Sequence, residues 1–131
     1  MFRLILVALV LLGVALYLPD SRAAIYEKAA PALDPVFEWS TKGEMNKIAR
    51  EMELHERQHR SVPDRQQEFA DWMSQKFGTD PGALTDSWGR PYRWQAWPDS
   101  FAVISAGRDR TNYTEDDLRT ARPREYSARR R

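Results

Sequence analysis

The chain begins with an apolar run that differs from everything after it. Residues 4–18 contain no charged side chain and follow Arg3. A run of about fifteen residues suits the centre of a signal peptide and is short for a membrane-spanning helix, which needs about twenty. Arg3 can extend the anchored length by reaching toward lipid headgroups. We therefore expect residues 1–23 to be either a membrane anchor or a signal peptide cleaved near Ala23.

Two amphipathic helices are predicted after a stretch that prolines interrupt. Residues 24–40 contain Pro31 and Pro35, which favour a linker or a broken helix. Residues 41–44 and 64–67 each match a capping box, and Gly78 supplies a stop for the second helix. The apolar stripes at helical spacing are Met45, Ile48, Met52, His55 and His59, then Phe69, Trp72, Met73 and Phe77.

The remaining pattern is typical of short strands and turns. Residues 92–97 and 101–105 are strand candidates separated by three turn residues, which predicts a β-hairpin. A polar loop follows, and the basic residues 119–131 are expected to form a disordered tail. The pattern predicts one α+β domain at residues 41–118, with helices packed on a small antiparallel sheet.

Amino-acid composition and net charge exclude some kinds of binding site. The 131 residues carry a formal net charge of +1 and no cysteine. The absence of cysteine excludes disulfides and thiolate metal sites, and the near-neutral charge gives no support for a nucleic-acid partner. The arginine-rich tail is the exception, since a basic cluster is drawn to anionic lipid headgroups or to an acidic partner.

Three segments carry a resemblance to a known family. Residues 86–94 read DSWGRPYRW and are similar to the D-P-W-G-x-P-Y-x-Y signature of the major (G-type) pseudopilin of type II secretion systems. Residues 101–109, FAVISAGRD, resemble that family's F-x-x-x-S-x-G-x-D strand and loop, and residues 116–118 resemble its closing D-D-I. The matching positions that define the motif are Asp86, Trp88, Gly89, Pro91, Tyr92 and Gly107.

The resemblance implies a pilin-like fold, in which a long N-terminal helix (a membrane segment followed by amphipathic helix) packs on a small antiparallel sheet. It also implies protein partners in a secretion or pilus-like assembly and a place in the bacterial inner membrane, single pass, with the C-terminal domain on the periplasmic side. The sequence departs from the family in lacking a prepilin peptidase site and in having no acidic residue before Asp20.

The resemblance also implies a calcium site in the loop that closes the domain. The family's carboxylate ligands map onto Asp109, Asp116 and Asp117, and calcium prefers oxygen ligands of this kind. Arg108 and Arg110 lie in the same loop, and their guanidinium groups offer another way to neutralise these carboxylates. Both readings, a calcium loop and a loop neutralised by arginine, stay open at this point.

One motif points to a different class of protein. Residues 55–59 read HERQH, a literal H-E-x-x-H, in which His55 and His59 would bind zinc and Glu56 would activate water. No third ligand has a signature, and the charged residue inside the motif is unusual for a buried zinc helix. The sequence thus favours a non-enzymatic, membrane-anchored interaction protein. A small exported zinc hydrolase and a soluble module secreted after cleavage near Ala23 are the alternatives.

Overall fold

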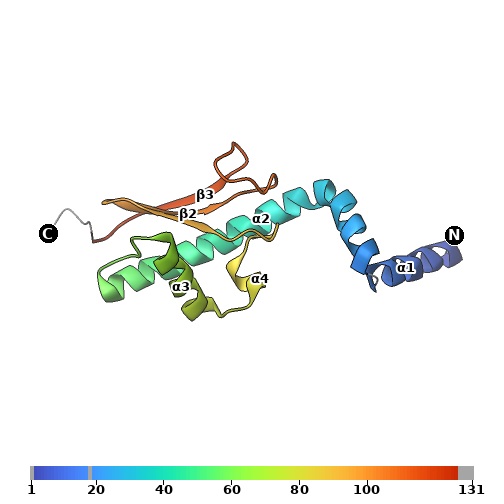
Figure 1. The fold of residues 1–131 in the computed structure, drawn as a ribbon, viewed down its shortest axis with the longest axis horizontal. Coiled ribbons are helices and arrows are strands. Elements are labelled where there is room, and N and C mark those ends of the chain that lie inside the picture. Colours follow the sequence, from blue (N-terminus) through green and yellow to red (C-terminus); the bar gives the residue numbers. More distant parts are fainter. Residues whose placement is uncertain (1, 18, 127–131) are drawn as a thin grey trace. The chain divides into compact units, whose positions relative to one another are not determined.

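The protein, described by a computed structural model over residues 2–17 and 19–126, contains helices and one antiparallel sheet. The chain divides into two compact units, Met1–Pro35 and Val36–Arg131. Helix α1 spans Phe2–Tyr17, and α2 spans Pro19–His59 and therefore belongs to both units (Figure 1). The second unit adds α3 (Gln66–Phe77), α4 (Pro81–Leu84), β1 (Arg93–Ala96), β2 (Ser100–Ser105) and β3 (Leu118–Pro123). The predicted α+β class is confirmed.

The first unit exposes apolar side chains on every side of α1. Its exposed large residues are Leu4, Ile5, Leu6, Val7, Leu9, Val10, Leu11, Leu12 and Val14. Because consecutive residues of a helix point about 100° apart, such a run leaves no polar face. Across the described part of the chain, no helix combines the length and the apolar character needed to cross a membrane.

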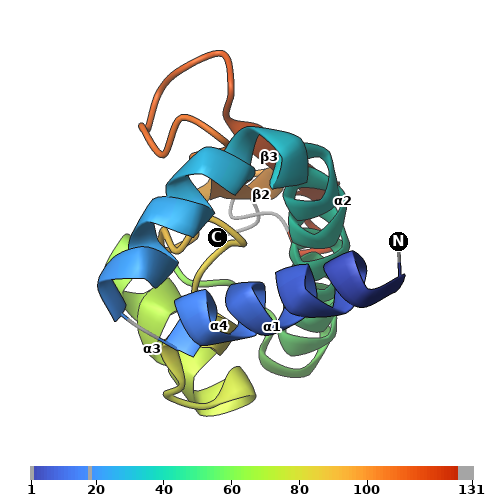
Figure 2. The same cartoon turned by 90° about the vertical axis from the view of Figure 1, so that its right-hand side faces the viewer.

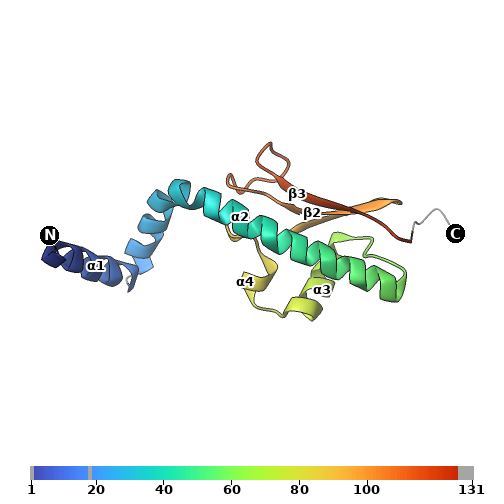
Figure 3. The same ribbon diagram turned by 180° about the vertical axis from the view of Figure 1, so that it is seen from behind.

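The second unit is a three-stranded antiparallel sheet with helices on one side. The strand order is β1-β2-β3, so β2 is central and the other two strands are edges. Figure 3 shows α2, α3 and α4 on the same side of the sheet. The loop between β2 and β3 projects at one end of the sheet (Figures 1 and 2), and its Arg108 forms an ion pair with Glu38 of α2. The predicted β-hairpin is confirmed as β1 and β2, paired with Trp94 opposite Val103.

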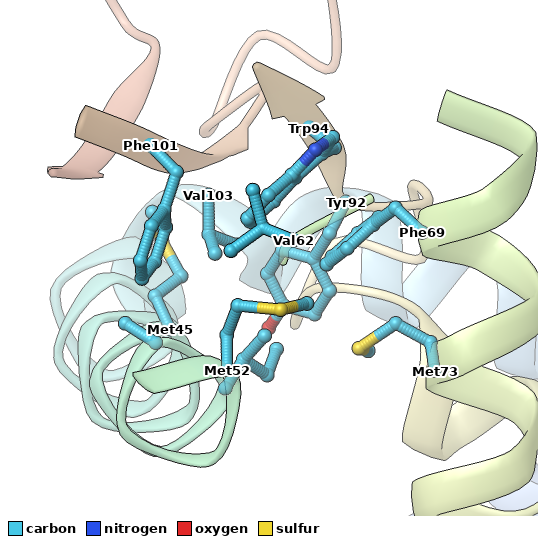
Figure 4. Packing of buried hydrophobic residues seen from close by; sticks show 11 residues of the cluster. Met45, Met52, Val62, Phe69, Met73, Tyr92, Trp94, Phe101 and Val103 are labelled. Carbon is cyan, nitrogen blue, oxygen red and sulfur yellow. The ribbon is translucent and has the colours of Figure 1, made fainter. Parts of the chain in front are cut away.

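The core forms where these layers meet. Met45 and Met52 of α2 face Phe101 and Val103 of β2, and Phe69 comes from α3 (Figure 4). The ring of Trp94 lies between those of Phe69 and Phe101, at centroid distances of 4.8 and 5.1 Å. Large aromatic rings stacked in this way bury much apolar area in a small domain. The predicted helical stripes therefore supply the core, with Met45, Ile48 and Met52 from α2 and Phe69 and Met73 from α3 all buried.

At residues 24–40, where the sequence favours a linker or a broken helix, the structure has helix. Helix α2 continues through Pro31 and Pro35, and the boundary between the two units follows Pro35. Each proline removes a backbone donor and crowds the carbonyl four residues earlier, which bends a helix but does not end it where neighbouring hydrogen bonds remain. The capping box at residues 41–44 is wrong for the same reason: Thr41 lies inside the helix, fully buried.

The predicted disordered tail is also wrong in part. Residues 119–123 belong to β3, which pairs with β2 from Ser105 opposite Leu118 to Ser100 opposite Pro123. Leu118 packs against the core, and the backbone hydrogen bonds of a central strand are completed by this pairing. The last part of the predicted tail, residues 127–131, lies outside the described residues.

Candidate functional sites

Asp86 is the centre of the turn that carries the first motif. Its carboxylate is buried, and Oδ1 accepts hydrogen bonds from the backbone N–H groups of Trp88 (3.1 Å) and Arg90 (2.9 Å). Its Oδ2 accepts from the Ser105 hydroxyl at 2.6 Å. A buried carboxylate must be satisfied in this way because an unpaired one is costly. Asp86 therefore joins the turn at residues 86–90 to the end of β2.

The other motif residues support this turn. Gly89 has a φ of +83°, a conformation that residues with a Cβ adopt at a cost. Trp88 and Tyr92 are buried, and the Tyr92 hydroxyl donates to Glu44 of α2 at 2.6 Å. Burial raises the pKa of Tyr92 well above its ordinary value, and the bond to Glu44 adds to this rise. The motif thus attaches the sheet to α2.

The two motif segments meet in space although about twenty residues separate them. The Ser105 hydroxyl, which donates to Asp86, also accepts from the Gly107 N–H at 3.1 Å. Gly107 has a φ of +72°, and a Cβ placed there would lie 1.9 Å from the backbone oxygen of Asp116. Residues 86, 105, 107 and 116 therefore form one chain of contacts at the base of the 107–117 loop.

The three predicted calcium ligands have separate surroundings. The Thr114 hydroxyl and the Thr111 N–H both donate to Asp109, and these bonds hold the pKa of Asp109 below its ordinary value. Asp116 meets Gly107 through its backbone rather than its carboxylate. The Asp117 carboxylate accepts a hydrogen bond from the Tyr113 N–H and forms an ion pair with Arg93 through the same oxygen. Among residues 2–17 and 19–126, no group of three His, Asp or Glu side chains is placed to hold a metal ion.

Arg93 of β1 is the residue that the sequence reasoning missed. Its guanidinium forms an ion pair with Asp117 and lies 4.1 Å from the centre of the Tyr113 ring. The two arginines that the sequence suggested are placed differently: Arg108 pairs with Glu38 at 3.4 Å, and Arg110 is exposed. The sequence did contain a signal for Arg93. Side chains alternate between the two faces of a strand, so Arg93 points away from the core face that its neighbour Trp94 occupies.

Calcium in this loop would have to share the Asp117 carboxylate with Arg93. Arg93 bonds to Oδ2, whereas the Asp117 Oδ1 atom is buried and has no hydrogen-bond partner, so it offers one oxygen to a cation. The guanidinium already supplies a positive charge to the same carboxylate. In the described arrangement the residues fit an arginine-neutralised loop better than a calcium loop.

We expect thermal unfolding of the wild-type protein to be the same in EDTA and in calcium. Arg93→Met should lower the stability by about 2 kcal/mol, because it removes the ion pair of a partly buried carboxylate. Calcium should then recover part of the loss, since the freed carboxylate can ligate it. Differential scanning fluorimetry in both buffers measures this, with Arg93→Met/Asp117→Asn as the control that removes the carboxylate. A calcium-dependent wild-type melting temperature would contradict the expectation.

The H-E-x-x-H segment lies in the last turns of α2, with Glu56 rather than the histidines on the core side. His55 is half-buried, His59 is exposed, and their rings stack with centroids 4.2 Å apart. The predicted stripe is therefore wrong at its end, because the spacing from Met45 and Met52 continues to Glu56 and not to His59. Glu56 is 1% exposed.

The carboxylate of Glu56 holds the C-terminal segment. Its oxygens accept hydrogen bonds from the backbone N–H groups of Glu125 (3.1 Å) and Tyr126 (3.2 Å). The buried guanidinium of Arg124 forms an ion pair with it at 3.4 Å and also donates to the Trp97 carbonyl at 3.0 Å. These partners occupy the carboxylate that the zinc hypothesis required as a base for water. Its role in the structure is to fix residues 124–126 against α2.

His55 makes the stability of the fold depend on pH. Burial lowers its pKa, and the positive charges of His59 and Lys76 lower it further. The unfolded chain therefore binds this proton more readily than the folded one, so stability is full above about pH 6.5 and falls as the pH drops through the folded pKa. We expect His55→Gln to lose less stability than the wild type between pH 7.5 and 5.5 in urea unfolding. Equal losses in the two proteins would contradict this.

Comparison of the chain with protein-family models, with curated proteins and with solved structures finds no match.

Proposed function

We propose that this protein is a non-enzymatic interaction protein held at the bacterial inner membrane by its N-terminal apolar segment, with the second unit on the periplasmic side. The observation that carries the proposal is the surface of α1, where large apolar side chains are exposed on all sides. Such a continuous apolar surface is stable when lipid or protein covers it and costly in water. The 16 residues of α1 rise about 24 Å, and Arg3 in its first turn can reach the headgroup level.

The second unit supports a role in contact rather than catalysis. Its buried charged side chains are used to join elements: Asp86 joins a turn to β2, and Glu56 joins α2 to the C-terminal segment. A helix carrying a small antiparallel sheet also agrees with the pilin-like arrangement that the motif resemblance implies. We therefore propose a pseudopilin-like structural protein, with secretion-system or pilus-like components as its partners.

Membrane fractionation of the full chain expressed in a bacterium tests the anchoring. We expect the protein to stay in the membrane pellet after alkaline carbonate washing, with residues 4–18 detected by mass spectrometry. Leu9→Asp/Leu11→Asp should move it to the soluble fraction, because each charge costs about 3 kcal/mol at the centre of a bilayer. Val36→Asp is the matched control, since it adds a charge at an exposed apolar position of the second unit.

Two outcomes would overturn the anchor. A wild-type protein found in the soluble periplasmic fraction without residues 4–18 would identify the segment as a cleaved signal peptide. A soluble wild-type protein that retains this segment would show that something other than lipid covers α1.

A further inference from the structure

The two edges of the sheet are not equivalent, because a side chain covers part of one of them. At the start of β1, two outward backbone groups are already bonded: the Trp94 N–H donates to Gln66 Oε1 at 2.7 Å, and the Tyr92 carbonyl accepts from Gln66 Nε2 at 3.1 Å. The amide of Gln66 thus makes the pair of hydrogen bonds that a neighbouring strand would make there. Gln66 does not reach Ala96 at the other end of β1, so this edge is blocked at its start.

The hydrogen-bonding pattern of β3 shows which of its backbone groups face outward. The Arg124 N–H donates to the Asp99 carbonyl at 2.8 Å, which continues the β2–β3 register by one residue. Because peptide groups in an antiparallel strand alternate in direction, those of residues 118, 120 and 122 point to β2. Those of Arg119 and Ala121 point away from it, as does the Pro123 carbonyl. Within residues 2–17 and 19–126, no hydrogen-bond partner is found for these outward groups.

The side chains along this open edge carry positive charge. Arg119, Ala121 and Pro123 are exposed, and β3 contains no acidic residue. The Arg119 guanidinium lies 4.8 Å from the centre of the Trp97 ring and makes no ion pair with a described residue. Arg122 donates to the side-chain oxygen of Asn46 at 3.2 Å and forms a long ion pair with Glu53 at 3.9 Å. Pairing β3 with a second copy of itself would bring these arginines together, which is unfavourable.

We propose that the outer edge of β3 binds an extended, acidic segment of a partner protein, which adds a fourth strand to the sheet. Main-chain hydrogen bonds to Arg119 and Ala121 would supply the pairing, and the arginines would select carboxylate side chains on the added strand. Arg119 stacked on Trp97 is held in place for this contact, because stacking restricts its otherwise mobile side chain.

This contact deepens the proposed interaction role and rests on it, but its test is independent of the membrane. The anchoring test changes residues of α1, whereas the binding test changes only β3. A protein that is not found in the membrane fraction would contradict the anchor but not the contact at β3, which peptide binding tests. A failure of peptide binding would contradict the contact at β3 but not the anchor.

The test uses the full chain in detergent and a synthetic seven-residue peptide of alternating glutamate and valine, with a lysine-for-glutamate peptide as the comparison. Hydrogen exchange measured by NMR should slow at the amides of Arg119 and Ala121 when the acidic peptide is added, and not when the basic one is. Arg119→Glu should weaken binding at least tenfold. A lack of protection at both amides with saturating acidic peptide would overturn the proposal.

A proline substitution separates strand pairing from simple charge attraction. Ala121→Pro removes one outward N–H that no other residue uses, and proline is tolerated on an edge strand in this position. It should weaken peptide binding at least tenfold, while the control Ala121→Val, which keeps the N–H, should bind as the wild type does. If Ala121→Pro bound the acidic peptide as tightly as the wild type does, the attraction would be due to charge alone. The same would follow if Ala121→Pro and Ala121→Val adsorbed equally to anionic vesicles and the peptide did not change that adsorption. Either result would overturn strand addition.

Discussion

Gly107→Ala is expected to destabilise the second unit by about 3 kcal/mol or more, because two costs add at this position. The residue has a φ of +72°, and its new Cβ would lie 1.9 Å from the backbone oxygen of Asp116. Backbone atoms on a closed loop cannot move aside as a flexible side chain can. The base of the 107–117 loop would have to open, and the bond from the Gly107 N–H to Ser105 would be lost with it.

The matched control for this change is Gly89→Ala. Gly89 has a similar φ of +83°, but no atom lies within 4 Å of the position of an added Cβ. It should therefore cost only the conformational penalty, about 1 kcal/mol. Urea unfolding followed by tryptophan fluorescence measures both variants. Equal losses would show that the contact between Gly107 and Asp116 is absent in solution.

Glu56→Ala is the second change with a large expected effect, about 3–4 kcal/mol, since it leaves a buried guanidinium and two backbone donors without their acceptor. Arg124 is only 7% exposed, so water can replace the lost carboxylate only in part. The amides of Glu125 and Tyr126 should also lose their protection from hydrogen exchange. Hydrogen exchange therefore shows which backbone groups lose their acceptor when Glu56 is removed.

Glu53→Ala is the control for Glu56→Ala. Glu53 lies one turn earlier in α2 and faces Arg122 at 3.9 Å across a partly exposed surface, where an ion pair contributes less than about 1 kcal/mol. A double-mutant cycle between Glu56 and Arg124 gives their coupling directly. Similar losses for Glu53→Ala and Glu56→Ala, with no coupling to Arg124, would contradict the structural role of Glu56.

Local pattern was enough to predict some elements of the second unit. Apolar spacing identified α3 and the core face of α2, and turn residues identified the hairpin of β1 and β2. The strand β3 was not predicted, because a run of alternating arginine, threonine and alanine has little apolar content of its own. It becomes a strand because β2 offers it unpaired backbone groups, which is a property of the tertiary structure.

The partners of the charged residues at the candidate sites were also not predictable from local sequence. The sequence placed carboxylates in the 107–117 loop and left two ways to neutralise them, calcium or the nearby Arg108 and Arg110. In the structure Asp117 is paired with Arg93, from a strand more than twenty residues away. Likewise, the H-E-x-x-H spacing says which residues share a helix face but not that Arg124 would occupy the carboxylate of Glu56. Pairings between distant residues need the fold.

The amide of Gln66 limits how much of β1 is available to another strand. A sheet open along both edges can be extended by one molecule and then by the next, which is the geometry of a growing fibre. Because the Trp94 N–H and the Tyr92 carbonyl are already bonded to Gln66, a strand added at β1 would find fewer free partners than a strand added at β3. Addition of one copy upon another is therefore disfavoured, and the sheet is biased toward joining a single partner.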